Sequence, residues 1–151
     1  MIVNHGKLKE IRNANRDKKI VFASGVFDLF HIGHLKYLKR AKKLGDILVV
    51  NVVNDSRVKI LKGNNRPIIN EKMRATIIDS LKFVDYVVIN PLINDGVSID
   101  CIKKLQPDYF GVREKTKYKE IKEISPNTKL VKIGETGIIS TTKIITKCKE
   151  T

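Results

Sequence analysis

The stretch SGVFDLFHIGH at residues 24–34 joins a short apolar run, 20–24, to a segment with helical spacing that begins near Gly33. A strand that turns directly into a helix is typical of the repeating unit of parallel α/β sheets. Gly25 allows a tight turn at the strand end. Gly33 allows an anion to approach the helix start, where free N–H groups and the positive end of the helix dipole favour negative charge. The stretch therefore predicts a strand, an anion-binding loop and a helix.

The same alternation continues along the chain. Short apolar runs rich in β-branched residues predict five strands, at 20–24, 47–53, 84–89, 108–112 and 129–133. Apolar residues at helical spacing predict helices at 35–44, 73–81, 97–105 and 140–149. Strands apolar on both faces indicate helices on both sides of the sheet. We therefore expect a Rossmann-like α/β fold, with a doubly wound parallel five-stranded sheet and its ligand at the carboxyl ends of the strands.

The length and the segment pattern favour one domain. The chain has 151 residues, 42% of them hydrophobic, which suits a single globular core. No internal repeat or linker divides it, so 1–151 is expected to form one domain. We predict a short lead-in helix over 7–17 ahead of the first strand, and a Ser or Thr cap on the closing helix.

Composition excludes several classes of protein. The net charge of +14 favours anionic partners, phosphates foremost. No apolar run approaches the roughly 20 residues that cross a bilayer, and the first residues lack the apolar stretch of a secretory signal. We therefore expect a cytoplasmic protein without membrane insertion. Cys101 and Cys148 are too few for a disulfide framework, and the histidines form no four-ligand pattern with them, so no metal site made by side chains is expected.

Two histidines flank the glycine at the predicted helix start. His31 and His34 are three residues apart, so both imidazoles can reach the same side and converge on one phosphate. This arrangement suits nucleotidyl transfer, in which a phosphate oxygen attacks the α-phosphorus of a nucleoside triphosphate and pyrophosphate leaves. Holding the reactants in line and neutralising the growing charge are sufficient, with Mg²⁺ carried by the triphosphate. The alternative is that the histidines only cap and cover the helix.

Residues 24–34 resemble the GxFDxxHxGH signature of the HxGH nucleotidyltransferase superfamily, in its cytidylyltransferase-like family. The resemblance extends from about Lys18 to Lys147. It implies that Phe27 packs under the nucleotide and that Asp28 braces the loop or orients the bound metal complex. It implies catalytic roles for His31 and His34, nucleotide-binding roles for Ser24, Gly25, Val26, Phe27, Asp28 and Gly33, and a homodimer.

Residues 54–67 resemble the second-strand loop of adenylyltransferase domains of the ADP-heptose synthase type. Asp55 is expected to cap the next helix. The resemblance implies that Lys62 faces the triphosphate or the sugar phosphate, with Lys59 as a further nucleotide-binding residue. A solvated basic loop is the alternative for either lysine.

Two later stretches continue the resemblance. Arg74 leads a helix that precedes VDYVV at 84–88, and in the family such an arginine meets the substrate side of the phosphates. The ISTTK stretch resembles the element that opens the last helix of the family and implies a clamp on the β- and γ-phosphates by Ser140, Thr141 and Thr142. A surface arginine and an ordinary helix cap are the alternatives.

Two departures from the family pattern bear on the substrates. Glu135 occupies the place of an arginine that precedes ISTT in glycerol-3-phosphate cytidylyltransferases, which weakens the cytidylyl interpretation. Residues 109–114, YFGVRE, replace the Lys-Gly-Gly-Asp usual in domains of the ADP-heptose synthase type. The acceptor contacts, the role of Arg113 and the role of the loop 111–118 therefore stay open.

We predict an enzyme that transfers a nucleoside monophosphate from ATP to a heptose-type sugar 1-phosphate and releases pyrophosphate, as in the synthesis of cell-envelope precursors. The alternative within the class uses CTP and glycerol 3-phosphate or a related alcohol phosphate. A basic nucleic-acid-binding module is the alternative outside it. Nucleic acid is the less favoured partner, because aromatic residues are only 6% of the chain and no DNA- or RNA-binding motif is visible.

Overall fold

The computed structural model describes residues 1–92, 98–112, 120–134 and 139–150. Within these residues a single sheet of six parallel strands forms the centre, in the order β1-β4-β3-β2-β5-β6. The strands are β1 (Ile2–Val3), β2 (Ile20–Gly25), β3 (Ile47–Val53), β4 (Tyr86–Asn90), β5 (Tyr109–Val112) and β6 (Lys129–Lys132). Because β2 pairs with both β3 and β5, the chain changes direction across the sheet at β2, as in a doubly wound fold.

The prediction of five strands is short by one. The additional strand is β1 at the sheet edge, where Ile2 lies opposite Val87 and Val3 opposite Val88 of β4. Two residues are too few to show a period of two in the sequence. The five predicted strands are all present, with boundaries that shift by at most two residues.

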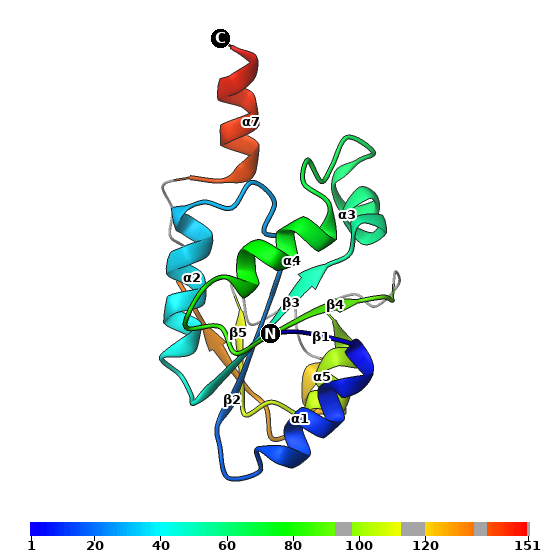
Figure 1. Cartoon of the computed structure of the whole chain (residues 1–151), viewed down its shortest axis with the longest axis vertical. Helices are drawn as coiled ribbons and strands as arrows, with labels where there is room; N and C mark the ends of the chain where they lie inside the picture. Colours follow the sequence, from blue (N-terminus) through cyan, green and yellow to red (C-terminus); the bar gives the residue numbers. More distant parts are fainter. Residues whose placement is uncertain (93–97, 113–119, 135–138, 151) are drawn as a thin grey trace.

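Helices cover both faces of the sheet, as predicted (Figure 1). They are α1 (Leu8–Ala14), α2 (Ile32–Lys42), α3 (Asp55–Lys62), α4 (Glu71–Asp79), α5 (Ile99–Leu105), α6 (Ile121–Ile124) and α7 (Thr141–Lys149), with a 3-10 turn at His5–Lys7. Alternate residues of β2 explain the two layers. Phe22 packs in a core with residues of α1, α5 and α6, whereas Ala23 packs in a second core with residues of α2 and α4.

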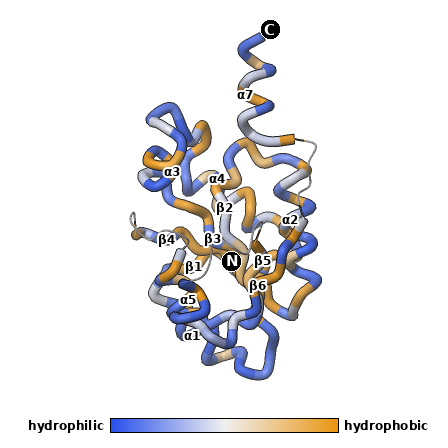
Figure 2. The backbone as a smooth tube through the Cα atoms, turned by 180° about the vertical axis from the view of Figure 1, so that it is seen from behind, coloured by the Kyte–Doolittle hydropathy of each residue, from blue (hydrophilic) through white to orange (hydrophobic). Residues whose placement is uncertain are grey.

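The two cores keep the central strands free of water. β3 is buried along almost its whole length, and in Figure 2 the hydrophobic colour follows it through the middle of the molecule. Figures 1 and 2 both show α7 extending away from the sheet, at the end of the molecule where the chain passes from β2 to α2. The carboxyl ends of the strands therefore face a region bordered by helix starts from several parts of the chain.

Two local predictions need correction. The lead-in helix predicted over 7–17 ends at Ala14, because the Asn15 side chain donates a hydrogen bond to the Ile11 carbonyl and gives the chain an alternative to a further turn. The cap of α3 is Asn54 and not Asp55: the Asn54 side chain accepts a hydrogen bond from the Arg57 amide at 2.8 Å.

Candidate active site

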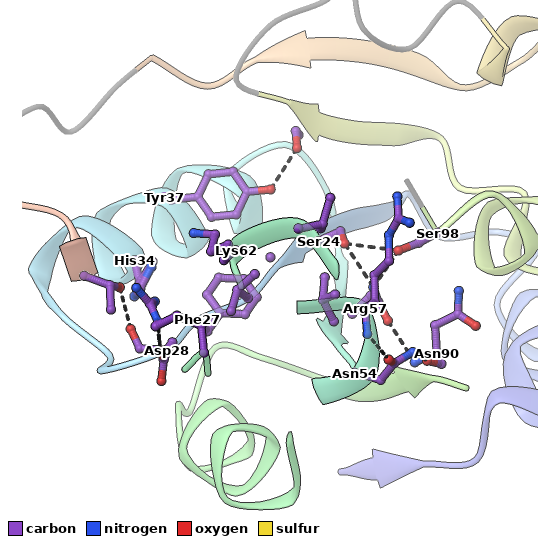
Figure 3. Close-up of a pocket in the computed structure, with 18 of the residues that line it drawn as sticks. Ser24, Phe27, Asp28, His34, Tyr37, Asn54, Arg57, Lys62, Asn90 and Ser98 are labelled. Carbon is purple, nitrogen blue, oxygen red and sulfur yellow. Dashed lines mark hydrogen bonds and ion pairs between the residues drawn. The ribbon is translucent and has the colours of Figure 1, made fainter. Parts of the chain in front are cut away.

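A cavity of about 320 Å³ opens beyond the carboxyl ends of β2, β3, β4 and β5. It lies where the strand order changes direction, the position at which open α/β sheets bind ligands. Its walls come from the loop between β2 and α2, from α3 and from the first residue of α7. Figure 3 shows two ends: His34, Asp28 and Lys62 lie toward one, and Arg57, Ser98 and Asn90 toward the other.

The β2–α2 loop holds an uncommon backbone conformation. Phe27 has φ of 55° and Leu29 has φ of 44°, a region that side chains other than glycine rarely occupy. A Cβ atom on Gly25 would stand 2.8 Å from the ring of Phe27, so a larger residue there would force this ring to move. The Phe27 ring is buried and meets His34 edge to face, with 5.4 Å between ring centroids. Such backbone strain is concentrated at functional sites. The contact between the rings of Phe27 and His34 packs α2 against this loop.

The two histidines lie together but have different positions. His31 caps α2, and its Nδ1 accepts a hydrogen bond from the Gly33 amide at 3.1 Å. Its ring stacks on His34 with 3.8 Å between centroids. His34 lines the cavity, whereas His31 does not. The structure therefore brings the predicted pair together, with His34 at the cavity wall and the His31 ring stacked against it.

Asp28 is fully engaged in bracing the loop before α4. Its carboxylate accepts hydrogen bonds from the amides of Ile68 and Ile69, both at 3.0 Å, and pairs with Arg66 at 2.8 Å. Burial disfavours the ionised form, but the two amides and the Arg66 guanidinium outweigh burial and hold the pKa of Asp28 below its ordinary value of 3.8. The backbone oxygen of Asp28 also accepts a hydrogen bond from the Thr141 hydroxyl at 2.7 Å. Of its two predicted roles, these contacts fit loop bracing.

The basic residues of α3 are arranged differently from the prediction. Lys62, the last residue of the helix, lines the cavity, and the helix stops there because Gly63 takes φ of 92°. Lys59 is exposed and does not line it. Arg57, which the sequence analysis did not single out, does.

Arg74 is completely buried and does not line the cavity. Its guanidinium donates to the carbonyls of Val26, Val53 and Ile69, and it pairs with Asp55 at 2.6 Å. These contacts join the β2–α2 loop, the end of β3 and the starts of α3 and α4. The predicted phosphate contact therefore has no support in this structure, because the donor groups of Arg74 already have protein partners.

The ISTT stretch opens α7 as predicted. Ser140 caps the helix by accepting a hydrogen bond from the Lys143 amide at 3.3 Å. Thr141 reaches the cavity, whereas Ser140 and Thr142 do not line it. Glu135 and Arg113 lie outside the described residues, as does most of the loop 111–118.

The predicted site residues thus divide into two sets. Those that line the cavity are Ser24, Gly25, Val26, Phe27, Asp28, His34, Lys62 and Thr141. Those that do not are His31, Gly33, Lys59, Arg74, Ser140 and Thr142. Most of the first set comes from one continuous stretch of sequence.

Apart from Ser24, the residues at the far end of the cavity were missed by sequence reasoning. There the buried Asn51 side chain donates to the Ser24 hydroxyl at 2.9 Å and to the Ser98 hydroxyl at 2.6 Å, and it accepts from the Asn90 amide at 3.1 Å. Asn54 donates to the Asn90 carbonyl at 2.7 Å (Figure 3). The sequence did contain a signal for this end of the cavity. Asn51 in ILVVNVV and Asn90 in YVVIN are polar residues toward the carboxyl ends of otherwise apolar strands.

The described residues hold neither a cluster of side chains suited to a metal ion nor a helix suited to crossing a membrane. Within them no cluster of three or more His, Cys, Asp or Glu side chains suits a metal ion. In the same part of the chain, no helix is both long enough and apolar enough to cross a membrane.

A doubly wound parallel sheet with an HxGH helix start at its switch point defines a nucleotidyltransferase. Residues 22–148 match the sequence model of the family described as "Cytidylyltransferase-like". The chain therefore belongs to the cytidylyltransferase-like family, which confirms the resemblance stated from its motifs.

The chain is similar to longer curated proteins. It is 44% identical over 147 residues to the bifunctional protein HldE of Helicobacter pylori strain G27, a match that covers 96% of this chain and 30% of that protein. It is 40% identical over 146 residues to HldE of Campylobacter concisus strain 13826, covering 95% and 30%. The chain thus spans about 30% of the length of these relatives.

Two solved structures are also similar. The lipopolysaccharide core biosynthesis protein of Thermoplasma volcanium GSS1 has a TM-score of 0.65 and 34% identity, covering 78% of this chain and 98% of that one. Pantoate-beta-alanine ligase of Francisella tularensis has a TM-score of 0.65 at 18% identity, covering 99% of this chain and 77% of that one. The second likeness shows the fold alone.

Proposed function

We propose that this chain transfers the nucleoside monophosphate of ATP to a heptose-type sugar 1-phosphate and releases pyrophosphate. The observation that carries the proposal is His34, which lines the cavity at the start of α2, in a protein of the cytidylyltransferase-like family. The resemblance of 54–67 to adenylyltransferase domains of the ADP-heptose synthase type and the similarity to HldE proteins support ATP and the sugar phosphate.

The reaction needs positioning and charge neutralisation. An oxygen of the acceptor phosphate forms a bond to the α-phosphorus, while the bond from that phosphorus to the oxygen bridging to the β-phosphorus breaks, and pyrophosphate leaves with that electron pair. His34 donates an N–H to the transferring phosphoryl group, supported by the stacked ring of His31. Lys62 holds the departing phosphates, and Thr141 borders them from α7.

The donor set also bears on Mg²⁺. Imidazole N–H groups and an ammonium suit phosphate oxygens, and the Asp28 carboxylate is already held by Arg66 and two amides. We therefore assign the Mg²⁺ ligands to the triphosphate and water, and Asp28 is not among them. When bound, the ion would neutralise charge on the β- and γ-phosphates.

The proposal also covers the oligomeric state, the cellular location and the biosynthetic role of the enzyme. We include a homodimer, which the family resemblance implies, and a cytoplasmic location as further parts of the proposal. The lipopolysaccharide core biosynthesis protein among the similar structures supports a place in the synthesis of cell-envelope precursors. The chain spans about 30% of its HldE relatives, so a second activity of those proteins is no part of this proposal.

A panel of ligands tests the substrates. Melting temperatures are measured with Mg²⁺ and ATP, CTP, GTP or UTP, followed by pyrophosphate release with heptose 1-phosphate or glycerol 3-phosphate. A ligand at about 100 times its Kd adds about 2.7 kcal/mol, which is several degrees for a chain of this size. We expect a shift with ATP and turnover with heptose 1-phosphate.

Other results would redirect the proposal. A shift with CTP alone and turnover with glycerol 3-phosphate would establish the cytidylyl alternative. Absence of any nucleotide shift, together with binding to nucleic acid that weakens by orders of magnitude at moderate salt, would contradict nucleotidyl transfer and favour the basic binding module.

A further inference from the structure

Arg57 places a positive charge in the cavity, and this charge has no role in the reaction proposed for His34, Lys62 and Thr141. It lies in the first turns of α3, is half-buried and lines the cavity. Its backbone amide donates to Asn54, but its buried Nε has no hydrogen-bond partner among the described residues. A buried donor without an acceptor is costly, so the position favours a ligand that supplies one.

The two neighbouring arginines give a contrast. Arg66 is paired with Asp28, and Arg74 is paired with Asp55, so both positive charges are neutralised inside the protein. Within the described part of the chain, no carboxylate forms an ion pair with Arg57, since Asp55 is already held by Arg74. Arg66 lines the cavity too, but with its charge paired, so Arg57 differs from its neighbours in presenting an unpaired charge there.

The surroundings of Arg57 are polar and uncharged. Ser24, Asn51, Ser98 and Asn90 lie at this end of the cavity and are linked by hydrogen bonds. Hydroxyl and amide groups of this kind suit the hydroxyls of a sugar, and a guanidinium suits a phosphate or carboxylate. Figure 3 shows Arg57 at the end opposite His34, so a group bound there is distinct from one held beside the histidines.

We propose that Arg57 binds the phosphate of the acceptor, while the linked serines and asparagines face the acceptor's hydroxyl groups. The inference rests on the proposed function and names the residue that recognises the second substrate. Arg57 then holds the attacking phosphate monoester from one side, and the triphosphate meets His34, Lys62 and Thr141 from the other. One phosphate oxygen stays directed at the α-phosphorus, as in-line attack requires.

The test separates the acceptor's phosphate from the phosphates of the nucleotide. The variants are Arg57→Gln, Arg57→Lys and, as a matched control, Arg16→Gln, which removes an exposed arginine that follows α1. Calorimetry measures the Kd of heptose 1-phosphate for each protein, pyrophosphate release gives the two KM values, and melting curves with Mg²⁺ and ATP report nucleotide binding.

We expect the Kd and KM for heptose 1-phosphate to rise roughly 10- to 100-fold in Arg57→Gln, as for loss of a charged hydrogen bond. The KM for ATP and the ATP-induced shift stay within about twofold of wild type, where a charge removed from the far end of the cavity has little effect. Arg57→Lys restores part of the affinity, since an ammonium keeps the charge without the planar fork. Arg16→Gln behaves as wild type, and unchanged melting of the unliganded variants shows that they fold.

Two kinds of result overturn the inference. An unchanged Kd for heptose 1-phosphate in Arg57→Gln removes Arg57 from acceptor binding, and a selective loss of ATP binding assigns it to the triphosphate. Failure of the proposed function would give a different combination of binding and turnover. Wild-type protein that binds heptose 1-phosphate through Arg57 but releases no pyrophosphate would contradict the transfer reaction and keep the site. Wild-type protein that neither binds nor turns over this sugar phosphate would contradict both.

Discussion

The two ends of the cavity are built in different ways. The histidine end takes most of its residues from one stretch, 24–34, together with Lys62 and Thr141. The asparagine end, defined by Ser24, Asn51, Asn90, Ser98 and Arg57, draws on residues of β2, β3, β4 and α3 and on the residue before α5, which are far apart in the sequence. The end proposed for transfer chemistry is thus encoded locally, whereas the surface proposed for the acceptor exists only when the parallel strands lie side by side.

The difference shows which parts of such an enzyme can vary independently. A loop whose conformation depends on Gly25 and on residues with positive φ tolerates little change, because its strain must be held by many contacts. A polar end made of single residues at several strand ends can change one position at a time.

The largest effect is expected from Arg74, which supports both ends. Arg74→Met leaves Asp55 and the three carbonyls without their partner, so the free energy of unfolding should fall by about 3–5 kcal/mol, and the melting temperature on the order of 10 °C. Denaturant unfolding measures the change. Arg16→Met, at an exposed position, should change stability by less than about 0.5 kcal/mol. Equal stability of the two variants would contradict the supporting role of Arg74.

The next largest effect is expected on kcat, from a substitution at the histidine end of the cavity. His34→Ala should lower kcat roughly 10²- to 10³-fold, the usual cost of removing one donor to a developing negative charge. Melting of the unliganded protein should change little, and the Kd for the sugar phosphate should stay near that of wild type. Stopped assays of pyrophosphate release give kcat. Turnover at the wild-type rate would contradict a catalytic role for His34 and make the two ends of the cavity equivalent.

The smallest effect is expected from Asp28, whose side chain joins the β2–α2 loop to the segment before α4. Asp28→Asn removes the charge that pairs with Arg66 and should destabilise the fold by about 1–3 kcal/mol at neutral pH. Burial raises the pKa of Asp28, but the amides of Ile68 and Ile69 and the Arg66 guanidinium lower it more, to below 3.8. A lowered pKa gives stability that is present above the unfolded value and is lost as the pH falls through the folded one.

The difference in unfolding free energy between wild type and Asp28→Asn should therefore be constant near neutrality and shrink below about pH 4. Urea unfolding from pH 7 to pH 3 measures it. A difference that does not change with pH would show that the Asp28 carboxylate is not held in its ionised form by the loop.

Local pattern was sufficient for much of the fold and for one end of the site. The strand at 47–53 was predictable because a β-branched apolar run leaves few other structures, whereas the two residues of β1 carry no period at all. His34 and Thr141 were singled out because the HIGH and ISTT motifs resemble helix starts of the family, and both residues line the cavity. Arg74 was assigned to phosphate because its place at a helix start does not reveal whether the side chain points into the core.

The sequence by itself determined the doubly wound class of the fold, the family and the histidine loop, because periodicity, glycine and helix capping act between residues close in the chain. Only the tertiary structure decided the tasks of the arginines. Arg57, Arg66 and Arg74 carry the same group within 18 residues, yet Arg66 and Arg74 are paired with Asp28 and Asp55. Arg57 lines the cavity and pairs with no carboxylate of the described residues. The physical reason is that ion pairing depends on which carboxylate the folded chain brings within reach, and sequence spacing does not contain that distance.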